Sequence, residues 1–216
     1  VVEPIRKLAA FRPAIADAYT AVAYFVAGLG SKVLLADGIA NAMTAYSATP
    51  ASLSASGALF VTLGYSLQIY FDFYGYSLAA IGLGHLFGFR FPANFLRPYD
   101  SLNPREFWRR WHVSLSYWIR DYLYLPLGGN LHYVRNITIV FALVGLWHGA
   151  GWNFVVWGLY HGALVAGYHV LRKPWDLLPK ALQWFLNFAL VSLGWSLFLY
   201  DFADAGALMK SLVGLG

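Results

Sequence analysis

The sequence contains no cysteine and few charged residues. Without cysteine the chain cannot form disulfides, thiolate metal sites, Cys-linked haem or an acyl-cysteine intermediate. Charged residues make up 12% of its 216 residues, about half of the ~25% typical of soluble proteins. Apolar residues reach 59%, aromatic residues 19%, and the mean hydropathy is +0.54. So few charges cannot cover a water-facing surface of this size, and the composition indicates a polytopic membrane protein.

The net charge of +5 does not indicate nucleic-acid binding, because the arginines occur in a few clusters beside apolar segments. Clusters of this kind are typical of orientation in a membrane and of contacts with lipid headgroups. We therefore predict membrane lipid, and no nucleic acid, among the partners of the chain.

Stretches without Asp, Glu, Lys or Arg mark the candidate membrane spans, since a helix that crosses a bilayer needs ~20 mostly apolar residues. Residues 181–200 predict one plain span, and residues 14–36 predict another that Asp17 and Lys32 interrupt. A span is also expected to begin near Leu53, after a polar loop. The pattern predicts an all-α fold, a transmembrane helical bundle formed by one membrane-embedded domain over residues 1–216.

The charge-free stretch from residue 136 to residue 171 is too long for one upright span. Gly149 and Gly151 are expected to break it into two helices. Non-helical backbone at that depth is tolerated only where protein or water surrounds it.

Charged residues concentrate between residues 97 and 121. Within this segment Asn103, Pro104 and Glu106 predict a helix start, as N-cap, first-turn proline and capping-box acid. The residues that follow alternate at spacings of three and four, which predicts an amphipathic helix over about 103–122 at the membrane interface. One face is aromatic, with Trp108, Trp111, Leu115, Trp118 and Tyr122; the other carries Arg105, Arg109, His112, Ser116 and Arg120.

The spacing of the residues does not decide between two interpretations of this helix. Its arginines either anchor it to lipid phosphates, or they receive a phosphorylated donor at the mouth of a cavity into which His112 points.

His148 lies deep in a charge-free stretch, between Trp147 and Gly149. An ionisable group inside a membrane segment is costly, and it is a candidate functional residue for that reason. Desolvation favours the neutral imidazole, which can accept a proton, and Trp147 and Asn153 offer hydrogen-bond donors nearby. The alternative is a histidine that only hydrogen-bonds a neighbouring helix. No metal is expected, because the histidines show no i, i+4 pair and no HExxH motif.

Several long motifs, in order, resemble those of the membrane-bound O-acyltransferases, and in particular the alginate O-acetylation branch of that family. They cover about residues 68–162: QIYFDF at 68–73, GFRFP at 88–92, FWRRWH at 107–112, WIRDYLY at 118–124, PLGGN at 126–130 and GLWHGAGWNFVVW at 145–157. Members of the family are longer, so the resemblance implies a chain that is incomplete at its N-terminus.

The resemblance implies a multi-spanning enzyme that passes an acetyl group from a cytosolic thioester donor to a hydroxyl of an exopolysaccharide. His148 matches the histidine regarded as catalytic, and His112 matches the second motif histidine. The donor is expected to be acetyl-CoA, with no other cofactor bound. A periplasmic acetyltransferase is the expected partner, and the inner membrane of a bacterium the expected location.

The hypothesis assigns further residues to this reaction by their place in the motifs. Arg105, Arg109, Arg110 and Trp111 are expected to bind the donor, while Trp147, Asn153, Asp72, Arg120 and Asp121 are expected to support the site. The rival hypotheses are a non-catalytic scaffold for a partner transferase and a proton-coupled transporter.

Overall fold

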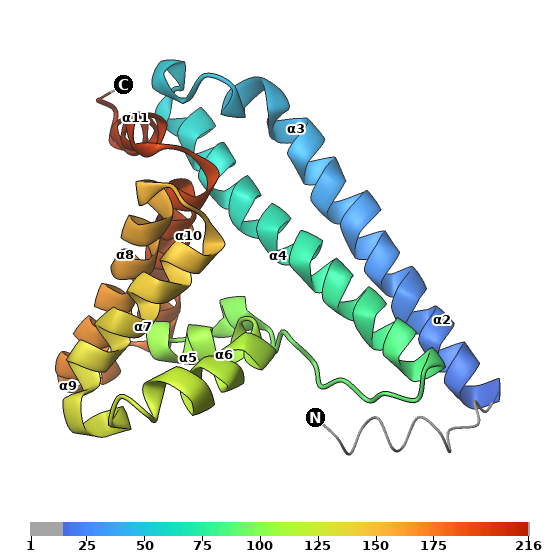
Figure 1. Cartoon of the computed structure of the whole chain (residues 1–216). Helices are drawn as coiled ribbons and strands as arrows, with labels where there is room; N and C mark the ends of the chain where they lie inside the picture. The colour runs from blue at the N-terminus through green and yellow to red at the C-terminus, as the bar shows by residue number, and fades with distance from the viewer. Residues whose placement is uncertain (1–14, 216) are drawn as a thin grey trace. The chain divides into compact units, whose positions relative to one another are not determined.

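The structure, a computed structural model, describes residues 15–215 (Figure 1). Ala14, the first residue of one predicted span, lies outside the described residues. All regular elements between residues 15 and 215 are helical, which confirms the predicted all-α class. The α-helices are α2 (Ile15–Gly30), α3 (Asp37–Ser47), α4 (Ala55–Leu86), α5 (Pro104–Arg110), α6 (Val113–Ile119), α7 (Tyr133–His148), α8 (Trp152–Val170), α9 (Arg172–Asp176), α10 (Lys180–Leu199) and α11 (Phe202–Leu212). The short 3-10 and π turns are η1 (Ser31–Ala36), η2 (Pro50–Ser52), η3 (Pro98–Asp100), η4 (Arg120–Tyr124) and η5 (Gly129–His132).

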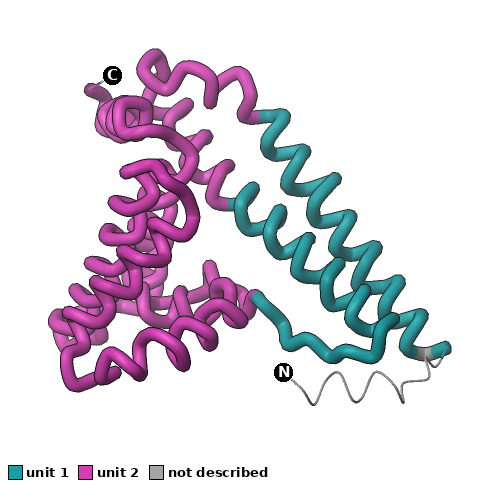
Figure 2. Tube along the Cα trace, viewed as in Figure 1, with its two compact units in different colours: residues 1–42, 67–94 teal, residues 43–66, 95–216 magenta. Residues whose placement is uncertain are grey.

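The chain forms two compact units (Figure 2). Unit 1 contains the described residues up to 42 together with residues 67–94, and unit 2 contains residues 43–66 and the described residues from 95 onwards. Two of the boundaries fall inside α3 and α4, and the third, between residues 94 and 95, falls in the non-helical segment that follows α4.

In unit 1, α2 packs antiparallel against the second half of α4. A Cβ atom on Gly28 would lie 2.6 Å from the carbonyl oxygen of Gly75, and one on Gly82 would lie 2.6 Å from that of Ala21. Residue numbers therefore rise along α2 as they fall along α4, and the missing side chains let the two backbones touch.

A charged group sits where α2 gives way to the π turn η1. The Nζ atom of Lys32 lies 2.7 Å from Oδ1 of Asp37 and 2.7 Å from Oδ1 of Asp72. The neighbouring Ser31 hydroxyl donates to the carbonyl of Phe71 at 2.8 Å. Asp72, a predicted supporting residue, thus forms an ion pair that ties α4 to η1 within unit 1.

Two helical stretches among the described residues are long and apolar enough to cross a membrane. They are Asp17–Ser47, which runs through α2, η1 and α3, and Lys180–Leu199, which is α10. The second confirms the helix predicted over residues 181–200. A larger number of spans stays a prediction.

The centre of unit 2 is the α7–α8 hairpin, against which α10 and α5 pack (Figure 1). A Cβ atom on Gly145 would lie 2.3 Å from the carbonyl oxygen of Phe154, and one on Gly158 would lie 2.1 Å from that of Phe141. The hairpin turns at residues 149–151, which confirms the break predicted at Gly149 and Gly151.

Large aromatic side chains from α8, α10 and the end of α5 pack between these helices. The ring of Trp195 on α10 lies 4.9 Å from Trp111 and 5.8 Å from Trp157, measured between ring centroids. Phe107 on α5 stacks on Trp111 at 5.5 Å. This aromatic core joins α5, α8 and α10, and His148 contacts it through Trp157.

The segment 103–122 is helical, but it is not the single amphipathic helix that its spacing predicts. It consists of α5, α6 and the π turn η4, with a break at Trp111 and His112. The helix start is confirmed, because the Glu106 amide donates to the Asn103 side chain at 2.8 Å. The predicted aromatic face is wrong beyond the helix start, since Trp111 is buried while Trp118 and Tyr122 are exposed. Burial of Trp111 in the aromatic core outweighs the helical period of the sequence.

We predict opposite effects for two Gly→Ala substitutions in α8. Gly158→Ala should lower the melting temperature markedly, because its Cβ would meet a backbone oxygen at 2.1 Å. Gly167→Ala has nothing within 4 Å and should raise the melting temperature by about 2–4 °C through helix propensity. Thermal unfolding of the purified chain in detergent measures both, and equal melting temperatures would contradict the packing described.

Candidate functional site

His148 ends α7 and lies against aromatic rings from three helices. Its ring centroid lies 4.8 Å from that of Trp147, 5.1 Å from Trp157 on α8 and 5.2 Å from Phe198 on α10. The contacts with Trp157 and Phe198 are edge to face, at 88° and 79°. The imidazole is thus half-buried in an apolar setting at the point where the hairpin turns.

The structure brings His112 close to His148, although 35 residues separate them in the sequence. Burial lowers the pKa of His112 to about 4, and repulsion by the positive form of His148 adds to the effect. Protonation of either imidazole therefore disfavours protonation of the other. The two rings come from segments that are distant in the sequence, so their proximity is a product of the tertiary structure.

The position of His112 follows from how α5 ends. Trp111 is drawn into the aromatic core, and its amide still donates to the Phe107 carbonyl at 2.9 Å. His112 then adopts a left-handed conformation with φ of 47°, from which α6 starts in a new direction. The Ser116 hydroxyl donates to the Trp108 carbonyl at 3.1 Å and joins the two short helices. A non-glycine residue at positive φ is strained, and such strain often occurs at functional sites.

The two predicted donors near His148 differ in availability. The Asn153 side-chain amide donates to the carbonyls of Leu197 and Tyr200, at 3.2 Å and 3.3 Å, so it holds the end of α10. Trp147 is 66% exposed while its ring contacts His148. Of the two predicted donors, Asn153 is thus occupied by α10, whereas the Trp147 ring lies beside the imidazole.

The four predicted donor-binding residues separate into two groups. Arg105 lies over the Tyr133 ring, 5.9 Å from its centroid, and Arg109 is exposed and close enough for its charge to act on the Tyr133 phenol. The His169 ring stacks on the Tyr133 ring, with 4.1 Å between the centroids. Arg105 and Arg109 thus form a cationic cluster beside Tyr133 at the start of α7.

Arg110 and Trp111 are engaged elsewhere. The Arg110 guanidinium lies 2.6 Å from the Glu106 carboxylate, and Trp111 is only 4% exposed. The structure therefore does not bring these two residues into the cationic cluster.

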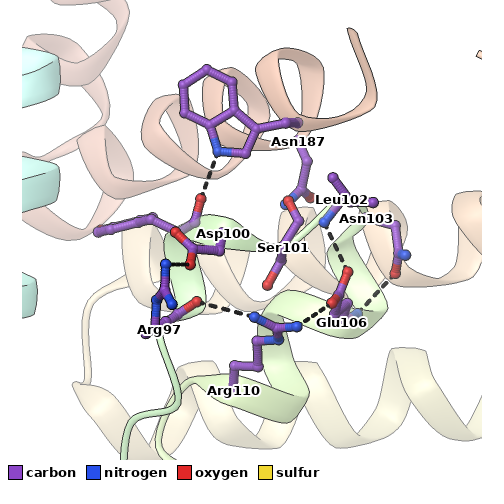
Figure 3. A network of polar contacts seen from close by, with 10 residues as sticks. Arg97, Asp100, Ser101, Leu102, Asn103, Glu106, Arg110 and Asn187 are labelled. Carbon is purple, nitrogen blue, oxygen red and sulfur yellow. Dashed lines mark hydrogen bonds and ion pairs between the residues drawn. The ribbon is translucent and has the colours of Figure 1, made fainter. Parts of the chain in front are cut away.

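Glu106 belongs to a polar network that fixes the start of α5 (Figure 3). Its carboxylate also accepts from the Leu102 amide at 2.8 Å, and the Ser101 carbonyl accepts from Asn187 on α10 at 2.9 Å. Two tryptophans extend the attachment, because Trp184 donates to Tyr99 and Trp175 donates to Leu102, at 2.8 Å and 2.9 Å. The loop before α5 is thereby held against α9 and α10.

The cationic cluster and the histidine pair lie at opposite ends of α7. From Tyr133 to His148 the helix rises by about 22 Å, at ~1.5 Å per residue. The remaining predicted residues are not gathered at either end: Arg120 and Asp121 pair with each other at 2.7 Å on the exposed turn η4, and Asp72 belongs to unit 1. Among the residues described, no cluster of three or more His, Cys, Asp or Glu side chains offers a metal site.

Sequence reasoning missed Trp157 and Phe198, which form two walls of the His148 site, and it assigned no role to His161. Trp157 lies at the end of the recognised motif at 145–157, so its place in the motif was the available signal. Phe198 carries no such signal, because only the packing of α10 brings it to the histidine.

We predict that His112→Gly is more stable than His112→Ala, because glycine adopts positive φ without strain of about 1 kcal/mol. Arg97 has a φ of 51° and provides the matched control: Arg97→Gly should likewise exceed Arg97→Ala in melting temperature. If the alanine variant is the more stable one at 112 while the control behaves as expected, the left-handed conformation of His112 is wrong.

The folded chain should lose stability as the pH falls from about 6.5 towards about 4. In that window the unfolded chain protonates His112 while the folded chain does not, so protons favour unfolding. Melting temperatures measured between pH 7 and pH 4.5 should fall less for His112→Asn, which cannot titrate, than for the unmodified chain. An equal fall in both would contradict the burial of His112.

The segments that carry this site match known proteins. Residues 11–199 match the family model of the membrane-bound O-acyltransferase family, MBOAT. A peptidoglycan O-acetyltransferase of Helicobacter pylori is 42% identical over 88% of this chain and 38% of its own length. A probable alginate O-acetylase of Azotobacter vinelandii is 45% identical over 81% of this chain and 36% of its own length. A teichoic acid D-alanyltransferase of Bacillus subtilis is 37% identical over 59% of this chain and 34% of its own length.

The chain thus spans a little over a third of the length of the curated relatives that it matches. The match with the family model nevertheless covers most of the chain, including the segments that carry His112 and His148. This agreement confirms the resemblance carried by the sequence motifs: the chain belongs to the membrane-bound O-acyltransferase family.

Proposed function

We propose that the chain carries the acyl-transfer centre of a membrane-embedded O-acetyltransferase, with His148 as the general base. The carrying observation is that His148 lies at the turn of the α7–α8 hairpin between the rings of Trp157 and Phe198, with His112 from a separate segment within range of its charge. An imidazole that stays neutral in an apolar setting suits the removal of a proton from an alcohol.

In this reaction the acceptor hydroxyl attacks the carbonyl carbon of a thioester. Its proton passes to a nitrogen of His148 while the new C–O bond forms, and negative charge gathers on the carbonyl oxygen. The indole of Trp147 is the remaining candidate donor to that oxygen. The C–S bond then breaks, the thiolate takes the proton back from His148, and ester and thiol leave.

His112 acts in this proposal as a positioning residue or as a second proton acceptor. Its positive form would oppose charging of the base, so His112 is not protonated while His148 holds the proton. An acyl-histidine intermediate is an alternative to direct attack, and trapping of labelled acyl-enzyme distinguishes the two.

The donor is proposed to bind through Arg105 and Arg109, whose guanidinium groups suit phosphate oxygens. Because the cationic cluster lies about 22 Å from His148 along α7, the thioester must sit on a long arm. Acetyl-CoA, with phosphates at one end and the thioester at the other, has this form. The arm would have to run along α7 towards His148.

The acceptor is proposed to be a hydroxyl of an alginate-like exopolysaccharide, supported by the 45% identity with a probable alginate O-acetylase. A peptidoglycan acceptor is the competing choice, given the Helicobacter relative. We further propose that the protein is a multi-pass protein of the bacterial inner membrane and that a periplasmic acetyltransferase completes the delivery.

Transfer of labelled acetyl from acetyl-CoA, measured in membranes that contain the chain, tests this function. His148→Ala should reduce turnover by ~10²–10⁴-fold, the usual contribution of a general base, and His112→Ala should also reduce it. His132→Ala is the matched control, because His132 is exposed and ends η5 away from the pair. Normal turnover by His148→Ala would refute the proposal.

The same assay separates the rival functions. A scaffold for a partner transferase consumes no donor in any variant, whereas a transporter moves solute without acyl-donor consumption. Either result would replace the enzyme hypothesis.

Neutralising the cationic cluster should weaken donor binding more than the chemical step. We expect Arg105→Gln and Arg109→Gln each to raise the KM for acetyl-CoA severalfold while kcat changes little. Lys173→Gln, which removes an exposed charge outside the cluster, is the control. A fall in kcat without a change in KM would contradict the assignment.

A further inference from the structure

Three tryptophan rings surround the buried imidazole of His161 on α8. The rings of Trp108, Trp157 and Trp195 lie 5.1, 5.2 and 5.6 Å from the imidazole. His161 is 0% exposed, and both of its ring nitrogens lack a partner among the described residues. The indole nitrogens of the same three tryptophans are also buried without a partner in the described part of the chain.

The five nitrogens belong to rings from α5, α8 and α10, so the grouping of these rings is a property of the tertiary structure. Buried polar groups are almost always paired, and each exception calls for an explanation such as a bound water. A local feature of one helix cannot explain these unpaired nitrogens, because they lie on three different helices.

The hydrogen-bond donors and acceptors among these nitrogens define which kind of ligand they can bind. Indole nitrogens only donate, whereas a neutral imidazole offers one donor and one acceptor. The group therefore presents four donors and one acceptor, and its partner must supply oxygen lone pairs together with at least one hydrogen. Water has this composition, while a metal ion offers no acceptor for the indoles.

We propose that His161, Trp108, Trp157 and Trp195 form an internal water-binding site, the His161 site. The water oxygens accept from the indole N–H groups and from the imidazole N–H, and a water hydrogen is donated to the second imidazole nitrogen. Bound water of this kind belongs to the structure and is costly to remove.

The backbone of α10 approaches the imidazole closely at Gly194. A Cβ atom on Gly194 would lie 2.5 Å from Nε2 of His161 and 2.8 Å from the Tyr160 ring. Glycine at this position therefore leaves room for the edge of the imidazole.

The His161 site also touches the proposed catalytic histidine through one side chain. The centroid of the Trp157 ring lies 5.2 Å from that of His161 and 5.1 Å from that of His148. Water that holds the Trp157 indole would also fix the wall against which His148 rests. This consequence rests on the proposed function, whereas the water site itself does not.

Selective ¹⁵N labelling of the tryptophan indoles in the whole chain, purified in detergent, tests the site directly. We expect cross-relaxation between bound water and the indole protons of Trp108, Trp157 and Trp195, with the sign typical of water that resides for longer than nanoseconds. The exposed Trp147 and Trp152 are the controls and should show only fast exchange with solvent. The absence of bound-water signals at all three buried indoles would overturn the proposal.

Thermal stability supplies a second and independent measurement. His161→Phe keeps an aromatic ring but removes both nitrogens, so it should lower the melting temperature by roughly 4–8 °C if water is bound. Were the nitrogens truly unpaired, the same substitution would raise the melting temperature, and that result would overturn the proposal. Tyr160→Phe is the control, because this neighbouring ring already donates its hydroxyl to the Leu190 carbonyl at 2.8 Å.

The measurements keep the two proposals distinct. Bound-water signals in a chain without acetyl transfer would support the His161 site and refute the proposed function. Where His161→Phe does not fold, the spectra of the unmodified chain decide the question alone.

Discussion

The direct backbone contact between α7 and α8 is the interaction on which unit 2 depends. Gly145 and Gly158 leave room for the carbonyl oxygens of Phe154 and Phe141, and no larger residue fits at either position. In a membrane, where apolar surface gives helices no reason to leave lipid, close packing of this kind drives their association. It fixes His148 at the turn of the hairpin and turns Trp157 towards it.

Aromatic side chains, rather than charged ones, position the histidines of unit 2. Trp157 and Phe198 set the orientation of His148 by edge-to-face contacts, and Trp111 draws the chain into the bend that places His112. Rings occupy large volumes with few rotatable bonds, so they position a neighbour at small entropic cost. The rings of Trp157 and Phe198 also surround His148 with apolar groups, which disfavour a charge on a buried imidazole.

The charged groups of Arg105 and Arg109 lie at the end of α7 that is far from His148. Arg105 and Arg109 gather near Tyr133 at the start of α7, while the histidine pair lies at the other end of the same helix. Arg110, next in sequence, is held by Glu106 and belongs to the network that fixes α5 to α10. Arg109 and Arg110 are neighbours in the sequence, but they contact different groups in the structure.

The sequence by itself determined the helical class, the helix start at Asn103, the break at Gly149 and Gly151, and the family, because each depends on local chemistry or on contiguous motifs. It misjudged the segment 103–122 as one helix, since periodicity carries no information about the core that captures Trp111. Only the tertiary structure decided that His112 meets His148, that Asn153 is occupied by α10, and that three tryptophans surround His161. These contacts join residues distant in sequence, and the close approach of glycine-lined helices fixes them.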